Sequence, residues 1–113
     1  MLQITTLTNE PKQRHQLILE NRETVNFRLY YSLRQQAWYF DFEYKDLVVN
    51  CSKVVLSPNT LRNFRKIIPF GIGFMADSYV EPFSIDDFSS QRVKMYILNQ
   101  TDVEEVEKTV YDY

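Results

Sequence analysis

Hydrophobic and polar residues alternate most regularly over residues 27–44, which read FRLYYSLRQQAWYFDFEY. Successive side chains of a β-strand point to opposite faces, so a period of two places every second residue on the same side. A polar stretch at residues 34–36 divides the run into two strands. The run therefore predicts a β-hairpin whose two apolar faces join one core. The side chains expected in that core are Val25, Phe27, Leu29, Tyr31, Leu33, Trp38, Phe40, Phe42 and Tyr44.

The opposite face of this hairpin is only partly polar. Tyr30 and Tyr39 fall there, among polar and charged neighbours: Asn26, Arg28, Asp41 and Glu43. A tyrosine combines an apolar ring with a hydroxyl that tolerates water, and such residues are enriched where proteins touch one another. The pattern therefore indicates a binding surface rather than a catalytic pocket, with Tyr30 and Tyr39 as candidate interaction residues.

Shorter runs of alternating or β-branched residues predict further strands on both sides of the hairpin. We expect them at residues 2–7, 15–20, 47–56 (one strand or two) and 92–99, with turns at 9–12 and 21–23 and a loop at 81–91. The only two glycines, Gly71 and Gly73, occupy alternate positions in the apolar segment IIPFGIGFMAD. Glycines so placed in a strand are typical of a bend, a bulge or the close approach of another backbone.

Two segments carry helix signals. Residues 57–66 start with Ser57 or Asn59 as a candidate cap and Pro58 at an early helical position, which predicts one helical turn. Near the C-terminus, Thr101 and Glu104 have the spacing of a capping box. In the short helix that this predicts, Val103, Val106 and Val110 would line one side and dock on a neighbour.

These elements predict an all-β fold, either a small β-barrel or a two-layer β-sandwich of about seven strands, with a short C-terminal helix. A chain of 113 residues is most simply one domain, so we expect a single β domain over residues 1–113. Within it, residues 101–113 form a helical or extended tail.

The aromatic content exceeds what so small a core needs. Rings make up 15% of the chain, as eight Tyr, eight Phe and one Trp. Because each ring can hide on the order of 150–250 Å², we expect some of them at the surface or against another chain.

Charge and cysteine content argue against several classes of function. The net charge of −2 gives no attraction for nucleic acid, and the one basic cluster, Arg62, Arg65 and Lys66, suits a solvated turn or an acidic partner better than phosphate. The single cysteine, Cys51, cannot form an internal disulfide, which fits assembly in a reducing cytoplasm. No apolar run approaches the roughly 20 residues that span a bilayer, and no signal peptide is indicated. We expect neither nucleic-acid nor membrane binding.

No set of residues predicts catalysis, a metal or a cofactor. His15 is the only histidine and is expected to be a partly buried strand residue, while Cys51 is expected to be a small buried hydrophobe. The nearest thing to a carboxylate pair, Asp86 and Asp87, lacks the spacing of a calcium loop and suits a turn in which an aspartate binds backbone N–H groups. Trp38 is expected in the core.

The order of these elements resembles the small baseplate plug family of contractile-tailed bacteriophages. The corresponding parts are the strand at 27–33, the turn at 34–36, the Trp-led strand at 38–42, the strands at 47–56, the Asp-Asp loop at 84–88 and the closing strand at 93–98. The acidic tail after Thr101 has no part in the pattern. The resemblance implies a non-enzymatic virion component, made in the host cytoplasm, that sits near the baseplate axis and contacts the tail hub, tube or wedge.

The leading hypothesis is therefore a structural baseplate protein that plugs or braces the central region. Its predicted interaction residues are Tyr30, Tyr39, Arg62, Arg65, Asp86, Asp87, Val106 and Val110. The alternative is a small-ligand carrier in which the aromatic rings line the cavity of a β-barrel. An enzyme ranks third and would depend on Asp86 or Asp87.

Overall fold

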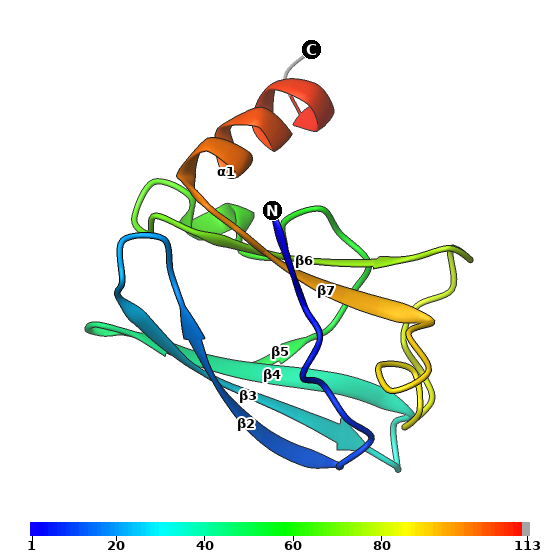
Figure 1. The fold of residues 1–113 in the computed structure, drawn as a ribbon. Coiled ribbons are helices and arrows are strands. Elements are labelled where there is room, and N and C mark those ends of the chain that lie inside the picture. Colours follow the sequence, from blue (N-terminus) through cyan, green and yellow to red (C-terminus); the bar gives the residue numbers. More distant parts are fainter. Residues whose placement is uncertain (112–113) are drawn as a thin grey trace.

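Seven strands form two antiparallel sheets that pack face to face in a computed structural model, which describes residues 1–111 (Figure 1). The strands are β1 (Leu2–Ile4), β2 (Lys12–Ile18), β3 (Thr24–Ser32), β4 (Ala37–Tyr44), β5 (Leu47–Lys53), β6 (Gly71–Ala76) and β7 (Val93–Leu98). One sheet has the order β1-β7-β6 and the other β2-β3-β4-β5. Over the described residues the sheets do not close into a barrel, so the predicted two-layer sandwich is confirmed and the barrel is not.

The predicted hairpin is β3 and β4. Its register places Phe27 opposite Phe42 and Leu29 opposite Phe40, so the apolar residues of both strands share one face. All the residues expected in the core are buried except Tyr31, which is half-buried, and Leu33. Leu33 is 80% exposed because β3 ends at Ser32 and Leu33 already belongs to the turn. Its predicted place in the core is wrong.

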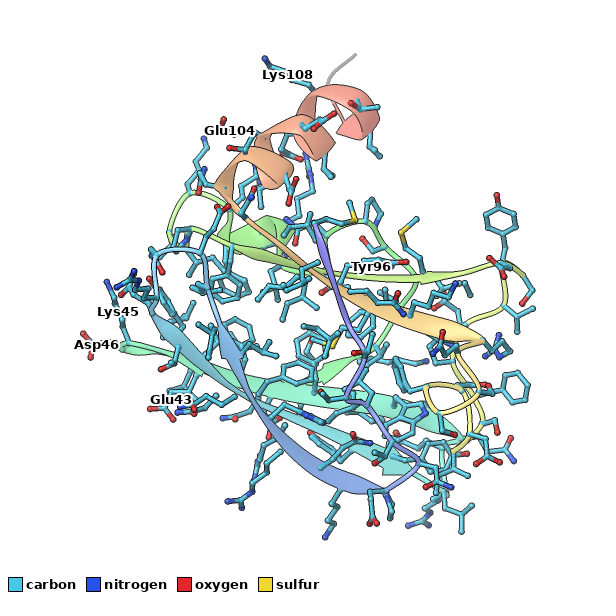
Figure 2. All side chains as sticks on the ribbon, viewed as in Figure 1. Glu43, Lys45, Asp46, Tyr96, Glu104 and Lys108 are labelled. Carbon is cyan, nitrogen blue, oxygen red and sulfur yellow. The ribbon has the colours of Figure 1, made fainter. Side chains whose placement is uncertain are left out.

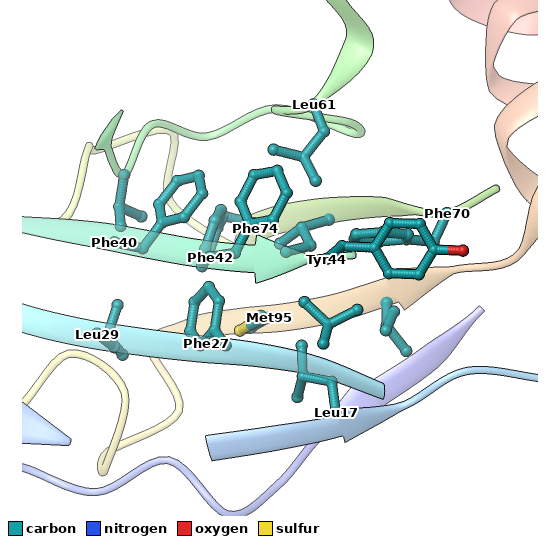
Figure 3. Close-up of a cluster of buried hydrophobic side chains, with 14 of the residues drawn as sticks. Leu17, Phe27, Leu29, Phe40, Phe42, Tyr44, Leu61, Phe70, Phe74 and Met95 are labelled. Atoms are coloured by element: carbon teal, nitrogen blue, oxygen red, sulfur yellow. The ribbon is translucent and has the colours of Figure 1, made fainter. Parts of the chain in front are cut away.

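Aromatic rings from both sheets fill the space between them (Figure 3). The ring of Phe40 in β4 lies 5.8 Å from that of Phe74 in β6, and the Phe42 ring meets Phe70 edge to face at 5.9 Å. Trp38 is fully buried, as predicted. The rings that this core encloses are Phe27, Trp38, Phe40, Phe42, Tyr44, Phe70, Phe74 and Phe88. Among the rings whose side chains are described, only Tyr79 and Phe83 are exposed, and both lie in the loop between β6 and β7.

Strand boundaries differ from the predictions where pairing overrides local sequence. β2 begins at Lys12, inside the predicted turn, because Lys12 pairs with Tyr30 of β3. β5 ends at Lys53, and its register against β4 shifts between Phe40 and Phe42. At this bulge Cys51 takes a left-handed conformation with φ of 58°. Cys51 is also exposed, so its predicted burial is wrong.

Both glycines of β6 lie where residues 57–60 come close, and at Gly73 the close neighbour is backbone, one of the three situations that the sequence left open. Residues 57–60 run along the outer edge of β6: Ser57 and Phe74 exchange two backbone hydrogen bonds of 3.0 Å, and Thr60 N–H donates to Ile72 at 2.7 Å. A Cβ on Gly73 would lie 2.7 Å from the carbonyl oxygen of Pro58. The predicted helical turn at 57–66 is a single 3₁₀ turn, η1 (Arg62–Phe64).

The C-terminal helix, α1 (Gln100–Val106), stands outside the sandwich beside β7 and continues as a wider turn, η2 (Glu107–Tyr111) (Figure 1). Its capping box is formed by Asn99 and Asp102, whose side chains bond each other's backbone N–H groups. The predicted box of Thr101 and Glu104 is therefore wrong by two residues. Val103 is 2% exposed and anchors the helix, as its predicted position required.

Candidate protein-interaction surfaces

The outer face of the four-stranded sheet carries the tyrosines that the sequence singled out. Figure 2 shows Glu43 of β4 on the side of this sheet that faces away from the core. On the same side Tyr30 and Tyr39 lie directly opposite each other, with their rings stacked at 6.0 Å between centroids. Both are half-buried. The pair thus presents a flat aromatic surface in the middle of a polar face, while its role in binding stays a prediction.

A buried carboxylate organises the centre of this face. Asp41 is 7% exposed and accepts hydrogen bonds from the Tyr30 hydroxyl at 3.1 Å and from the Cys51 backbone N–H at 2.7 Å. Arg28, directly across from it on β3, binds the second carboxylate oxygen through Nε at 3.1 Å and through its Nη2. Asp41 therefore holds the β5 bulge against β4 and fixes Tyr30 and Arg28 on the surface.

These contacts shift the pKa values of both groups. Burial alone would raise the pKa of Asp41, but the hydrogen bond from Cys51 N–H, together with Arg28 and Tyr30, lowers it below its usual range. Burial raises the pKa of Tyr30, and its hydrogen bonding to Cys51 and Asp41 raises it further. Asp41 is thus an anion and Tyr30 a neutral donor at neutral pH.

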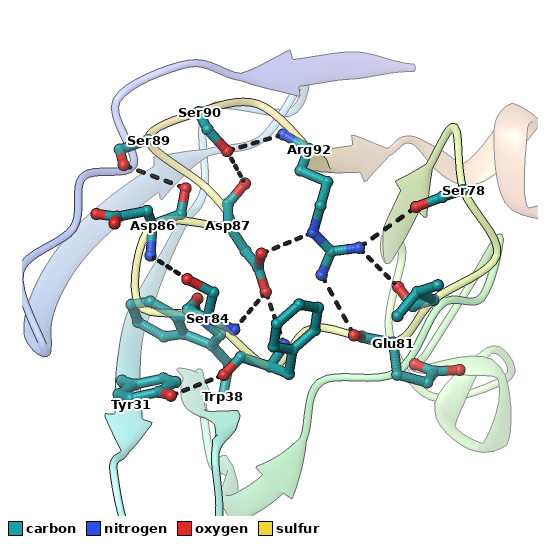
Figure 4. A network of polar contacts seen from close by, with 12 residues as sticks. Tyr31, Trp38, Ser78, Glu81, Ser84, Asp86, Asp87, Ser89, Ser90 and Arg92 are labelled. Atoms are coloured by element: carbon teal, nitrogen blue, oxygen red, sulfur yellow. Dashed lines mark hydrogen bonds and ion pairs between the residues drawn. The ribbon is translucent and has the colours of Figure 1, made fainter.

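A second buried carboxylate, Asp87, orders the loop between β6 and β7 (Figure 4). It is 2% exposed, accepts the backbone N–H groups of Phe83 and Ser84 at 2.7 and 2.8 Å, and pairs with Arg92 Nε at 2.7 Å. Burial alone would raise the pKa of Asp87, but Arg92 and the two N–H groups lower it. The prediction of a turn in which an aspartate binds backbone N–H groups is confirmed.

The two predicted loop carboxylates have different surroundings. Asp86 is exposed, and the Asn9 side-chain amide donates to it at 3.4 Å. Asp87 directs its oxygens into its own loop. A partner-binding role for Asp86 and Asp87 stays a prediction, and only Asp86 offers an exposed carboxylate for it.

The same loop carries the most exposed ring among those whose side chains the structure describes. Arg92 donates from its terminal nitrogens to the carbonyl oxygens of Val80 and Glu81 at 3.0 and 3.3 Å, and its guanidinium lies over the Phe83 ring. Next to these contacts Tyr79 is 97% exposed, and Val80 and Phe83 are about half-exposed. The Arg92–Asp87 pair thus holds a loop that presents apolar side chains to solvent.

A groove of about 660 Å³ lies at the opposite end of the sandwich, near the β2–β3 turn and the start of α1. Its lining includes Phe70 and Leu98 from the core and three exposed apolar side chains, Met1, Leu2 and Ile18. The groove is the second place where the surface of the described residues is strongly apolar.

The predicted basic pair faces the C-terminal segment. Arg62 and Arg65 both form ion pairs with Glu107, at 2.8 and 2.7 Å, so they tie η1 to the end of α1. Val106 is half-buried and Val110 is 42% exposed. Figure 2 shows Glu104 and Lys108 projecting from the helix away from the sheets. Partner contacts by these four predicted residues stay predictions, and Arg62 and Arg65 have an intramolecular partner that the sequence did not reveal.

Comparison with known proteins decides the family. A family model described as the cyanophage baseplate Pam3 plug gp18 matches residues 1–101 of the 113. The chain belongs to this baseplate plug family. The predicted resemblance to baseplate plugs is confirmed and is narrowed to a cyanophage family. No curated protein matches the chain.

Family membership makes the chain a structural component of a phage tail baseplate, in contact with other tail proteins. The match ends at residue 101, inside α1, so Glu107 and the rest of the C-terminal segment lie outside it. This agrees with the prediction that the tail after Thr101 is not part of the family pattern. Within residues 1–111, no helix of this plug-family chain has the length and apolar character to cross a membrane.

Groups capable of chemistry are dispersed in this baseplate protein. Over residues 1–111 no three His, Cys, Asp or Glu side chains come together as a metal site would require. His15 is half-buried, as predicted, and burial lowers its pKa. Its Nε2 lies 2.8 Å from the Gln13 side-chain oxygen.

Sequence reasoning missed Asp41, Arg92, Glu107 and Tyr79. For Asp41, an acid opposite an arginine on a predicted hairpin was available as a signal. Tyr79 lies in a short polar segment after an apolar strand, which is a signal for an exposed ring. Arg92 and Glu107 act through contacts with distant loops, and the sequence carries no local sign of them.

Proposed function

We propose that this chain plugs or braces the central hub and tube region of its baseplate, through protein–protein contacts and without enzymatic activity. In this proposal it acts as one domain over residues 1–113, is made in the host cytoplasm and is built into the virion beside hub, tube or wedge proteins. The observation that carries the proposal is the match of residues 1–101 to a baseplate plug family.

The distribution of exposed apolar side chains supports such contacts. Monomeric proteins seldom leave contiguous apolar surface uncovered, and such surface commonly marks an interface. Here exposed apolar side chains form two groups at opposite ends: the loop with Tyr79, Val80 and Phe83, and the groove with Met1, Leu2 and Ile18, while others lie singly elsewhere on the surface. A domain with a packed aromatic core and apolar surface at two ends suits a protein that contacts two neighbours in an assembly.

The ligand-carrier alternative gains no support. A carrier would need an enclosed cavity between the sheets, and the rings expected to line one pack against each other instead. We therefore propose no second function.

The proposal is tested by purifying virions and isolated baseplates of the encoding phage and quantifying this chain by mass spectrometry. We expect a fixed copy number per baseplate, and tails from a phage lacking the gene should be incomplete or should contract prematurely. A chain abundant in infected cells but absent from purified baseplates would contradict the proposal.

A further inference from the structure

A continuous row of side chains crosses the outer face of the four-stranded sheet. The registers place Lys12 beside Tyr30, Tyr30 beside Tyr39 and Tyr39 beside Lys53, one residue from each strand. The stacked tyrosines are therefore flanked on both sides by lysines. Both lysines are exposed.

The neighbouring row adds two arginines. Arg14 of β2 lies directly opposite Arg28 of β3, and Arg28 lies opposite Asp41 of β4. Like charges in directly opposite positions repel each other, and of these two arginines only Arg28 is paired with Asp41. Arg14 is left beside another cation. The row also lines a shallow hollow of about 600 Å³ on this face, whose far side carries Glu43.

The charge of these two rows is largely uncompensated. Within the described part of the chain, Lys12, Arg14 and Lys53 take part in none of the ion pairs. The one carboxylate in the two rows, Asp41, is buried and already bound. A protein of net charge −2 thus carries a local basic patch around an aromatic pair.

We infer that this basic-aromatic patch docks an acidic segment of another baseplate protein, an inference that rests on the proposed function. Carboxylates of the partner would pair with Lys12, Arg14 and Lys53, and its apolar stems would lie on the Tyr30–Tyr39 rings. Complementary charge speeds association and fixes register, while aromatic residues at the centre of a patch supply contact area.

An acidic protein fits this patch better than DNA does. Binding to a phosphate backbone gains from many cations in line and from an attractive overall charge. Here three unpaired cations flank a tyrosine pair on a chain whose net charge is negative. A short segment with two or three carboxylates matches that number of charges.

The test measures binding of the purified full-length protein to baseplates from a phage that lacks its gene. The variant Lys12→Glu/Lys53→Glu reverses the charge at both ends of the tyrosine row, and Lys108→Glu reverses one charge at an exposed lysine outside the patch. We expect the double variant to bind at least tenfold more weakly, with loss of the salt dependence of binding, and Lys108→Glu to change binding less than twofold. Unchanged thermal unfolding of both variants shows that the effect is on binding.

The outcomes separate the two proposals. Equal binding of the double variant and the wild type would overturn the patch and leave the baseplate function standing. Loss of binding after nuclease treatment would overturn it in favour of DNA. No binding of the wild type, together with its absence from virions, would overturn both.

Discussion

Two buried aspartates, Asp87 in the β6–β7 loop and Asp41 on the outer sheet face, have similar partners and different surroundings. Asp87 accepts two backbone N–H groups and Asp41 accepts one, and each pairs with an arginine. The Arg92 side chain is only 26% exposed and gives its other donors to loop carbonyls, whereas that of Arg28 is 53% exposed. The first cluster is closed on itself, and the second leaves its arginine and tyrosines open to solvent.

This contrast distinguishes polar groups that stabilise the fold from polar groups that are exposed to a partner. Breaking a buried ion pair is costly because the remaining charge loses its compensation, while an exposed arginine can turn to water. The sequence marked Asp86 and Asp87 as candidate interaction residues. Asp87 is a poor candidate because its carboxylate is buried and bound within its own loop. The open cluster around Asp41 is the better candidate surface.

The largest expected effect is that of Asp87→Ala. It removes the acceptor of two backbone N–H groups and leaves Arg92 unpaired, so the free energy of unfolding should fall by about 3–5 kcal/mol. Urea denaturation measures this. The adjacent exposed residue supplies the control, since Asp86→Ala should change stability by less than about 0.5 kcal/mol. Similar losses for both variants would contradict the closed-cluster interpretation.

A smaller loss is expected for Asp41→Ala. The Cys51 N–H and the Tyr30 hydroxyl lose an acceptor, but Arg28 stays hydrated, so stability should fall by about 1–3 kcal/mol. Urea denaturation compares it with the Asp87 variant. A loss as large as that of Asp87→Ala would show that the two clusters are energetically alike.

Acid should weaken the fold through both aspartates. Their pKa values are lowered in the folded chain, so the unfolded chain binds protons first as pH falls. Their contribution is fully present above the unfolded value of about 3.9 and is lost as pH falls through the folded values. Between pH 6 and pH 3, the free energy of unfolding of Asp87→Asn should therefore change less with pH than that of the wild type. His15, whose pKa is also lowered, contributes equally to both curves.

The smallest effect should come from Arg28→Ala. The Arg28 side chain is 53% exposed, and without it Asp41 still accepts hydrogen bonds from the Cys51 N–H and the Tyr30 hydroxyl. The free energy of unfolding should therefore fall by less than about 1 kcal/mol. The melting temperature provides the check. A drop of several kcal/mol would mean that Arg28 belongs to a closed cluster as Arg92 does.

Local patterns predicted the all-β class and the central hairpin well, because alternation along β3 and β4 is read from neighbouring residues, but they left the sandwich and the barrel as alternatives. They failed where pairing is non-local: Lys12 joined β2 through Tyr30, and Cys51 was pushed outward by the bulge opposite Asp41. The helix cap moved to Asn99 because β7 ends at Leu98 and leaves Asn99 to begin the helix.

The candidate site was predicted in part for the same reason. Tyr30 and Tyr39 follow from the period of the hairpin, so their shared outer face was foreseeable. Arg62 and Glu107 lie 45 residues apart in the sequence, and only the folded chain brings them together. A local sequence pattern does not predict which charged residue from a distant part of the chain will pair with a given side chain.

Because Gly73 has no side chain, another segment of the chain can cover the free edge of β6. Residues 57–60 can lie along that strand only because nothing projects from Gly73 toward Pro58. A larger residue there would lift this cover and expose unpaired N–H and C=O groups along an apolar strand edge, where other copies could add strands and form fibres.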